Sequence, residues 1–220
     1  MKKNLTLIAL VAAVSVAAPA FAEGGSYHWT TATGETVGTG NNAIHVQAGF
    51  PGISGGWYHG LSEKMDIGAR FSFNYAYEST FGFGIIGLAP GLKPAAILKF
   101  GLMDNGKFNM ALRIEPGIHL YFAGGGVLFG LDTPVLLDMG IRVNEQFSVL
   151  LGAGLPLSFN FTPLFVMAIP IMVGGGVEYK FTPDMALTFN MKFGPAIIAS
   201  GFGSGASFAF ESLIGLAFKL

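Results

Sequence analysis

The sequence predicts an all-β fold, an antiparallel up-and-down transmembrane β-barrel. Three observations lead to this prediction. Hydrophobic residues make up 51% of the 220-residue chain, whereas charged residues make up only 11%. Apolar and polar side chains alternate with a period of two along several long segments. Short polar turn motifs recur about every 39 residues, which is enough for two membrane-crossing strands and a connection.

The N-terminus has the three parts of a secretory signal peptide. A basic start at Lys2 and Lys3 precedes an apolar run over 5–18, and the run ends in Ala20-Phe21-Ala22. We therefore expect residues 1–22 to be a signal peptide that is cleaved after Ala22. The alternative, an uncleaved membrane anchor, is disfavoured because the run is short and its end is rich in small residues.

The composition also excludes several classes of protein. The chain has no cysteine, so it has neither a disulfide framework nor a thiolate metal site. Its formal net charge is −1 and it has no basic run, so nucleic acid is not an expected partner. The four histidines show no metal-ligand spacing. We expect no metal and no cofactor.

A membrane protein must be either a helical bundle or a closed β-barrel, because only these satisfy every backbone hydrogen bond in hydrocarbon. The charge-free segment 147–177 is long enough for a transmembrane helix. Pro156, Pro163 and Pro170 interrupt it, however, and three glycines follow at 174–176. These residues disfavour a membrane helix in this segment, and the alternation elsewhere favours strands.

The alternation is clearest over 65–77, 108–122 and 185–193. Weaker segments at 92–102, 129–143 and 208–220 keep the same rhythm. None of these six segments places a charge on its apolar face. A lysine or arginine facing mid-bilayer would cost roughly 2–4 kcal/mol, which gives this segregation a physical cause.

Counting segments between turn motifs gives about ten strands in a barrel over 42–220, with eight as the main alternative. The first hairpin is the least certain, because its alternation is ambiguous around Trp57, Tyr58 and His59. Residues 23–41 show little periodicity and many Thr and Gly, so we expect a flexible lead-in there. The ten predicted strands are 42–50, 53–60, 66–77, 87–103, 107–122, 127–142, 147–159, 165–180, 185–199 and 206–220.

The connections alternate in character. Short charged turns occur at 61–64, 104–107, 143–146 and 182–184, and longer Gly-rich connections near 79–91, 123–128, 160–164 and 200–206. In bacterial barrels the short turns face the periplasm and the long loops face outward. With an even number of strands, both termini are expected on the periplasmic side.

The C-terminal residues 213–220 resemble the terminal-strand signal that the barrel-assembly machinery reads in bacterial outer-membrane proteins. Gly215, Phe218 and Leu220 match that signal, although the final aromatic residue of many such proteins is absent. The alternating pattern resembles the broad superfamily of OmpA-like and OmpW-like barrels. This resemblance implies a location in the Gram-negative outer membrane, with its lipid and the barrel-assembly machinery as partners.

Charged residues of both signs gather on the inward face, several positions above the short turns. A barrel of ten strands has a narrow lumen, so these charges are expected to pair as a network that plugs its lower part. A selectivity constriction in a narrow pore is the alternative. The predicted lumen ion-pair cluster comprises Arg70, Lys99, Arg113, Glu115, Asp138, Lys192 and Glu211.

Small and apolar residues occupy the inward positions of the outer half. They predict a roomier, non-polar vestibule that binds or passes a small hydrophobic molecule. The alternative is that these small residues merely accommodate barrel curvature and tight packing. The vestibule residues are Gly117, Gly152, Gly154, Pro156, Pro170, Met172 and Ala196.

Catalysis is not expected. His119 and Asp132 fall on neighbouring predicted strands near the outer rim, where omptin-like proteases place Asp and His pairs. A single such pair with short loops favours ordinary lumen polar groups, and we assign no catalytic residue. The sequence therefore predicts a narrow pore or a small-molecule site in a barrel. The alternative is a closed structural or adhesive barrel whose ion pairs block transport.

Overall fold

The structure is a computed structural model that describes residues 28–76, 80–81, 88–123, 125–162, 165–201 and 203–220. The predicted signal peptide lies outside the described residues. Among the described residues, no helix is long and apolar enough to cross a membrane. The strands are β1 (Asn42–Phe50), β2 (Gly52–Ser62), β3 (Met65–Ala76), β4 (Thr80–Phe81), β5 (Leu88–Asp104), β6 (Phe108–Ile114), β7 (Gly117–Ala123), β8 (Gly126–Arg142), β9 (Phe147–Asn160), β10 (Val166–Pro170), β11 (Met172–Thr182), β12 (Met185–Ser200) and β13 (Gly203–Lys219).

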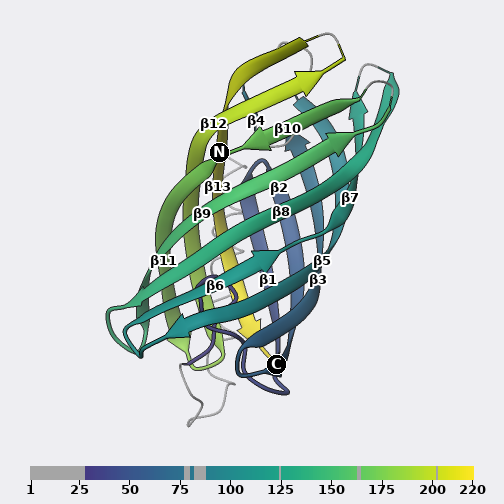
Figure 1. The fold of residues 1–220 in the computed structure, drawn as a ribbon. Coiled ribbons are helices and arrows are strands. Elements are labelled where there is room, and N and C mark those ends of the chain that lie inside the picture. Colours follow the sequence, from purple (N-terminus) through teal and green to yellow (C-terminus); the bar gives the residue numbers. More distant parts are fainter. Residues whose placement is uncertain (1–27, 77–79, 82–87, 124, 163–164, 202) are drawn as a thin grey trace, which may run out of the picture.

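The strands form one closed antiparallel barrel (Figure 1). Successive crossings of the ring pair with one another, and β1 closes the ring against β13 from Ala43↔Lys219 to Phe50↔Ser212. The chain runs along the barrel wall ten times. Strands β6 and β7 are two halves of one such crossing, and so are β10 and β11, whereas the short β4 pairs with β13 and adds no crossing. The fold prediction and the preferred strand number are confirmed.

Alternation along the strands sorts side chains between the interior and the exterior. In β1, Ala43, His45 and Gln47 are buried, whereas Ile44 and Val46 are exposed. The first hairpin follows the same rule, since Trp57 points outward and Tyr58 is buried. The outer wall therefore presents large apolar side chains from every part of the ring. They include Phe71, Phe73, Leu131, Leu155, Val173, Phe189, Phe193, Ile197, Phe208 and Ile214.

Prolines break two strands that the sequence predicts as continuous. The predicted strand 107–122 ends at Ile114 and resumes at Gly117, with Pro116 between the halves. The predicted strand 165–180 is interrupted at Ile171, next to Pro170. Proline has no N–H to donate to the neighbouring strand, so the ladder is interrupted at these positions.

Two outer connections are shorter than predicted. The expected loops near 123–128 and 200–206 are tight turns between β7 and β8 and between β12 and β13. Gly125 and Gly203 have positive φ values of 79° and 138°, which are readily adopted only by glycine. These glycines reverse the chain within a few residues. The predicted connection over 79–91 lies largely outside the described residues.

The largest difference concerns the predicted flexible lead-in. Residues 28–41 enter the barrel near its short-turn end, seen as the purple segment before β1 in Figure 1. Trp29, Thr30, Thr31, Thr33 and Val37 are all buried there. We call this segment the plug. It has no strand periodicity because it lies across the lumen as irregular chain.

The sorting of side chains predicts the effect of one charge on the outer wall. Phe193 is exposed near the middle of β12, and Asn190 on the same strand lines the interior. Phe193→Lys is expected to lower the free energy of unfolding by about 2–4 kcal/mol, because the ammonium would face lipid. Reversible urea unfolding in phospholipid vesicles measures this, with Asn190→Lys as the inward control. Equal losses in both variants would contradict the assignment of faces.

Candidate functional site in the barrel lumen

The plug is held to the barrel wall by polar contacts in several directions. Lys99 of β5 donates hydrogen bonds to the backbone oxygens of Thr30, at 3.2 Å, and of Glu35. Arg142 of β8 pairs with the Glu35 carboxylate. Across the lumen, Thr30 donates to a carboxylate oxygen of Glu178 on β11 at 2.5 Å. The plug is therefore tied to strands on different sides of the ring.

Backbone groups of the plug are also satisfied by the wall. The Val37 amide donates to both carboxylate oxygens of Asp66 on β3, at 3.1 and 3.2 Å. The Gly34 amide donates to Asn109 Oδ1 on β6 at 2.8 Å. Buried backbone groups need such partners, because losing one costs about as much as a broken hydrogen bond. Because these contacts involve backbone amides of the plug, they determine the path of its main chain through the lumen.

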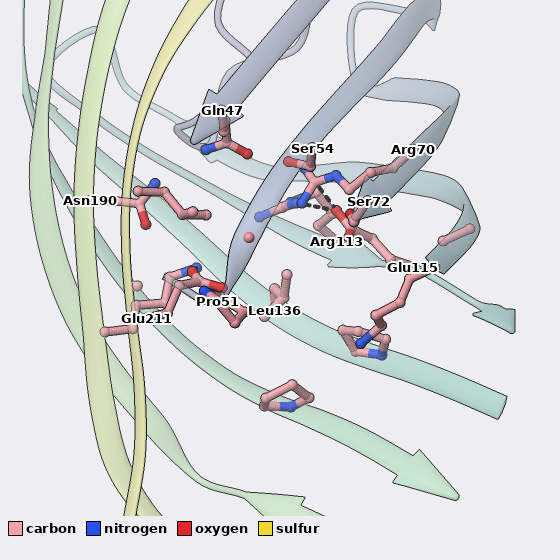
Figure 2. Close-up of a pocket in the computed structure, with 18 of the residues that line it drawn as sticks. Gln47, Pro51, Ser54, Arg70, Ser72, Arg113, Glu115, Leu136, Asn190 and Glu211 are labelled. Atoms are coloured by element: carbon pink, nitrogen blue, oxygen red, sulfur yellow. Dashed lines mark hydrogen bonds and ion pairs between the residues drawn. The ribbon is translucent and has the colours of Figure 1, made fainter. Parts of the chain in front are cut away.

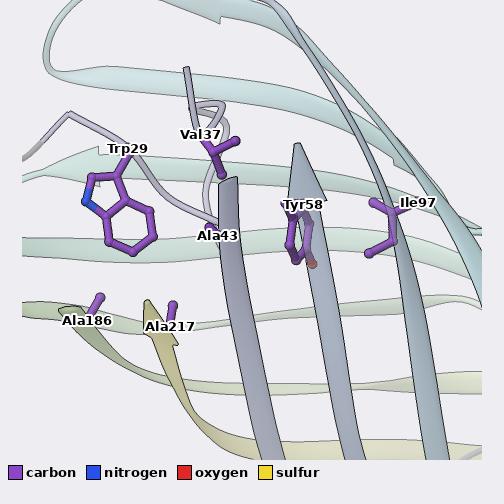
Figure 3. Packing of buried hydrophobic residues seen from close by; sticks show 7 residues of the cluster. All are labelled: Trp29, Val37, Ala43, Tyr58, Ile97, Ala186 and Ala217. Carbon is purple, nitrogen blue, oxygen red and sulfur yellow. The ribbon is translucent and has the colours of Figure 1, made fainter. Parts of the chain in front are cut away.

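Apolar side chains of the plug and the wall pack together in one cluster (Figure 3). Trp29 and Val37 from the plug lie among wall residues of five strands, and both are fully buried. Glycines allow the close approach: a Cβ on Gly60 would lie 2.0 Å from the backbone oxygen of Gly38. The cluster consists of Trp29, Val37, Ala43, Tyr58, Ile97, Ala186 and Ala217.

Above the plug, four predicted lumen charges meet in one ion-pair network. Figure 2 shows three of them, Arg70, Arg113 and Glu115. Arg113 pairs with Glu115 and, at 2.5 Å, with Asp138 on the neighbouring strand β8. Arg70 from β3 approaches Glu115 at 3.3 Å and donates to the Tyr58 hydroxyl at 2.9 Å. The network combines two guanidinium groups with two carboxylates, so its formal charges balance.

The other three predicted cluster residues lie apart from this network. Lys192 and Glu211, on the adjacent strands β12 and β13, form their own pair at 3.7 Å. Lys99 holds the plug instead of pairing with the other charges. The sequence places all seven residues on the inward face, but the tilt of the strands spreads them around the lumen.

A second polar group lies nearer the outer end. His119 Nδ1 lies 2.9 Å from Asp132 Oδ1, and His119 Nε2 lies 2.7 Å from Asn160 Oδ1. Lys93 pairs with the other Asp132 oxygen at 2.9 Å. The imidazole is fully buried with both nitrogens engaged. In this arrangement both ring nitrogens have polar partners within the lumen.

A cavity of about 160 Å³ occupies the lumen above the plug. It extends from Ala32 of the plug to Pro51 and Gly52 at the outer turn between β1 and β2. Charged side chains of the ion-pair network line it together with Leu136, Leu150 and Leu213. The cavity thus has both charged and apolar walls.

The predicted vestibule residues divide into two groups. Gly152, Pro156 and Met172 line the cavity. Gly117 and Gly154 instead make close contacts within the wall, and buried Ala196 packs with Met172 and Ala209. Pro170 is buried at a strand break. Arg70, Lys93 and Asp132 line the same cavity, so its walls carry charged as well as apolar side chains, and the non-polar vestibule stays a prediction.

The residues of the predicted assembly signal lie on the closing strand β13 and just after it. Gly215 faces inward, where a Cβ would lie 2.6 Å from His45 Nε2. Phe218 pairs with Ile44 and Met185 of the neighbouring strands, and the Leu220 amide donates to the Asn42 oxygen at 2.8 Å. These positions close the ring, and recognition by the assembly machinery stays a prediction.

Sequence reasoning missed the plug as part of the site. A signal was nevertheless present: inward charges such as Asp66, Lys99, Glu178 and Lys180 crowd the lower lumen and require partners. Within the part of the chain that the structure describes, no three His, Cys, Asp or Glu residues are grouped to hold a metal ion.

The fold and lumen together define a closed ten-stranded β-barrel with an internal N-terminal plug. The sequence matches no protein-family model, and no curated protein matches it. Among solved structures, the chain is similar to the outer membrane protease OmpT from Escherichia coli, with 11% sequence identity and a TM-score of 0.47 over 89% of this chain and 100% of that chain. It is also similar to a KdgM porin, with 10% identity and a TM-score of 0.37 over 81% of this chain and 98% of that chain. Similarity at this level says nothing about the activity of the chain.

The ion-pair network predicts a large cost for losing one partner. Asp138→Asn removes one of the two carboxylates that neutralise buried Arg113. We expect the free energy of unfolding to fall by about 3 kcal/mol, because a charge is left without its partner. Urea unfolding of the refolded protein measures the loss. Glu145→Gln, at an exposed turn position, is the matched control and should be neutral; a comparable loss there would contradict the network's role.

Proposed function

We propose that the protein is an integral outer-membrane barrel that binds a small molecule in its luminal cavity. The observation that supports this most directly is the position of the cavity, which lies above the plug and extends to Pro51 at the turn between β1 and β2. The apolar outer wall supports a lipid environment. The short-turn end would then face the periplasm.

The same geometry favours binding over free conduction. The plug fills the lower lumen with buried groups that are bonded to the wall at Lys99, Asp66 and Glu178. A solute crossing the barrel would have to displace this segment or pass between buried ion pairs. A luminal binding site needs neither, because a ligand reaches the cavity without moving the plug. The walls favour a ligand with both apolar and charged parts.

The engaged His119 argues against a peptidase in this lumen. Hydrolysis by an Asp–His pair needs a ring nitrogen within reach of the attacking water. Here one nitrogen contacts Asp132 and the other contacts Asn160. We therefore propose a non-catalytic protein. Peptide hydrolysis that Asp132→Asn abolishes would reverse this conclusion.

Ligand binding is tested by placing a larger side chain on a residue that lines the cavity. A Cβ on Gly152 would point toward Lys192 with no contact closer than 3.4 Å, so a larger side chain there enters the cavity. We expect a dansylated fatty acid to bind the refolded protein saturably and Gly152→Phe to weaken binding about tenfold or more. Leu155→Phe, exposed on the same strand, is the control. Absence of saturable binding would leave a closed structural barrel as the better description.

The plug predicts the conductance of the barrel. In planar bilayers the refolded protein is expected to show no discrete channels, because residues 28–41 fill the lower lumen. Removing 24–38 takes away most of the plug and should yield reproducible conductance steps. Gly34→Leu offers a second route, since its Cβ would lie 2.1 Å from the Met110 nitrogen and displace the plug. Equal conductance with and without the plug would contradict this assignment.

A further inference from the structure

Two hollows meet at one stretch of the barrel wall. One is the luminal cavity, and the other is a groove on the outer surface across β1, β2, β3, β5 and β7. Arg70, Pro94, Ala95 and Ile118 line both. The interior and the lipid-facing surface are therefore separated there by little more than these residues.

The strand ladder is interrupted at this place. Strand β5 pairs with β7 at Leu92↔Leu120 and again at Ala95↔Gly117, and the pairing skips the two residues between, which include Pro94. Pro94 has no N–H to donate toward β7, and Pro116 has none to donate toward β5. The Ala96 amide donates to the Pro116 oxygen at 2.9 Å, which resumes the ladder below the gap. The wall between β5 and β7 therefore lacks two ladder hydrogen bonds at this gap.

The groove outside this gap is apolar. Trp57, Phe71 and Ile118 are 43%, 53% and 38% exposed and form its sides. Small residues leave the space between them open, since Gly55 and Ala69 also line the groove. A Cβ on Gly55 would meet nothing within 4 Å. In a bilayer this surface fits an alkyl chain.

One charged residue connects the two sides. Arg70 is the sole charged residue among those that line the groove within the described chain, and it also lines the cavity. Its guanidinium contacts the Tyr58 hydroxyl and Glu115, whereas Glu115 is also held by Arg113. Arginine carries five N–H donors, so Arg70 can accept a further anionic partner. Lys93 lines the cavity beside it, on the neighbouring strand.

We propose that the wall between Pro94 and Ile118 is a lateral portal for a single-chain amphiphile with an anionic head group. The head group binds at Arg70 inside the lumen, and the alkyl chain lies in the outer groove between Trp57 and Phe71. The proposal rests on the proposed function, since it names the ligand class of the luminal cavity and its route of access. It adds that the ligand arrives from the lipid.

The test uses laurate and two reporters, one on each side of the wall. The chain has no cysteine, so Ser72→Cys places a single thiol in the cavity, opposite Lys93 on the neighbouring strand. Trp57 becomes the one tryptophan when Trp29 is replaced by Phe, and 11-bromoundecanoate then reports the alkyl chain by quenching it. Laurate should slow reaction of the thiol with a water-soluble maleimide, and the uncharged lauryl alcohol should not. Arg70→Gln should weaken the effect about tenfold, and Arg70→Lys should retain most of it.

The portal itself is tested by restoring the missing donors. In Pro94→Val/Pro116→Val, quenching of Trp57 should persist while laurate no longer protects the thiol. Pro195→Val, at an exposed proline of β12 away from the groove, should retain both signals. Ala69→Leu, which fills the groove from outside and leaves the ladder intact, should reduce both.

The outcomes separate the two proposals. Full protection of the thiol in both the double proline variant and Ala69→Leu would overturn the portal and leave luminal binding in place. Protection by lauryl alcohol equal to that by laurate would overturn the anionic head group. Loss of saturable binding of the dansylated fatty acid by the unmodified protein would overturn the proposed function itself.

Discussion

The pairing of every backbone N–H and C=O around a closed ring is the constraint on which the rest of this structure depends. In hydrocarbon an unpaired backbone group costs several kcal/mol, so an open sheet edge is not tolerated. Strand β13 meets β1 along eight paired residues, from Phe50↔Ser212 to Ala43↔Lys219, and so joins the last strand to the first. Once the ring is closed, each strand has one face toward the surroundings and one toward a narrow lumen. The alternation of Phe, Leu and Val with polar residues follows from that geometry.

Closure forces polar groups into a confined interior, where each must find a partner. In the upper and middle lumen the strands supply their own partners, as Arg113 does with Asp138 and Lys93 with Asp132. In the lower lumen they do so only in part, as Lys180 does with Glu178 at 3.6 Å. There the plug supplies backbone oxygens for Lys99, an amide for Asp66 and a hydroxyl for Glu178. The plug is thus as much a part of the polar interior as the wall, and the luminal cavity lies above it.

At one level of the barrel, prolines remove some of the backbone hydrogen bonds that closure of the ring otherwise supplies. Pro134 and Pro156 face each other on β8 and β9, and Pro116 and Pro170 interrupt the strands on either side of this pair. Each proline removes an N–H from the wall, which a continuous barrel would not favour. Between β5 and β7 two such losses coincide with an apolar groove outside and a charged cavity inside. This coincidence distinguishes that stretch of wall from the other strand breaks.

The amino-acid sequence by itself indicated about ten crossings, with eight as the alternative, and the face on which residues of the clearly alternating segments lie. These are local properties, because a period of two links each residue to its immediate neighbours and lipid excludes charge from one face. Only the tertiary structure decided which charges pair. Lys99 bonds to the plug and not to the predicted cluster, whereas Arg70 and Arg113 both pair with Glu115. Register and strand tilt set those distances, and they depend on closure of the whole ring. The position of residues 28–41 was decided at the same level, because an irregular segment acquires its path from surrounding partners and has no periodicity of its own.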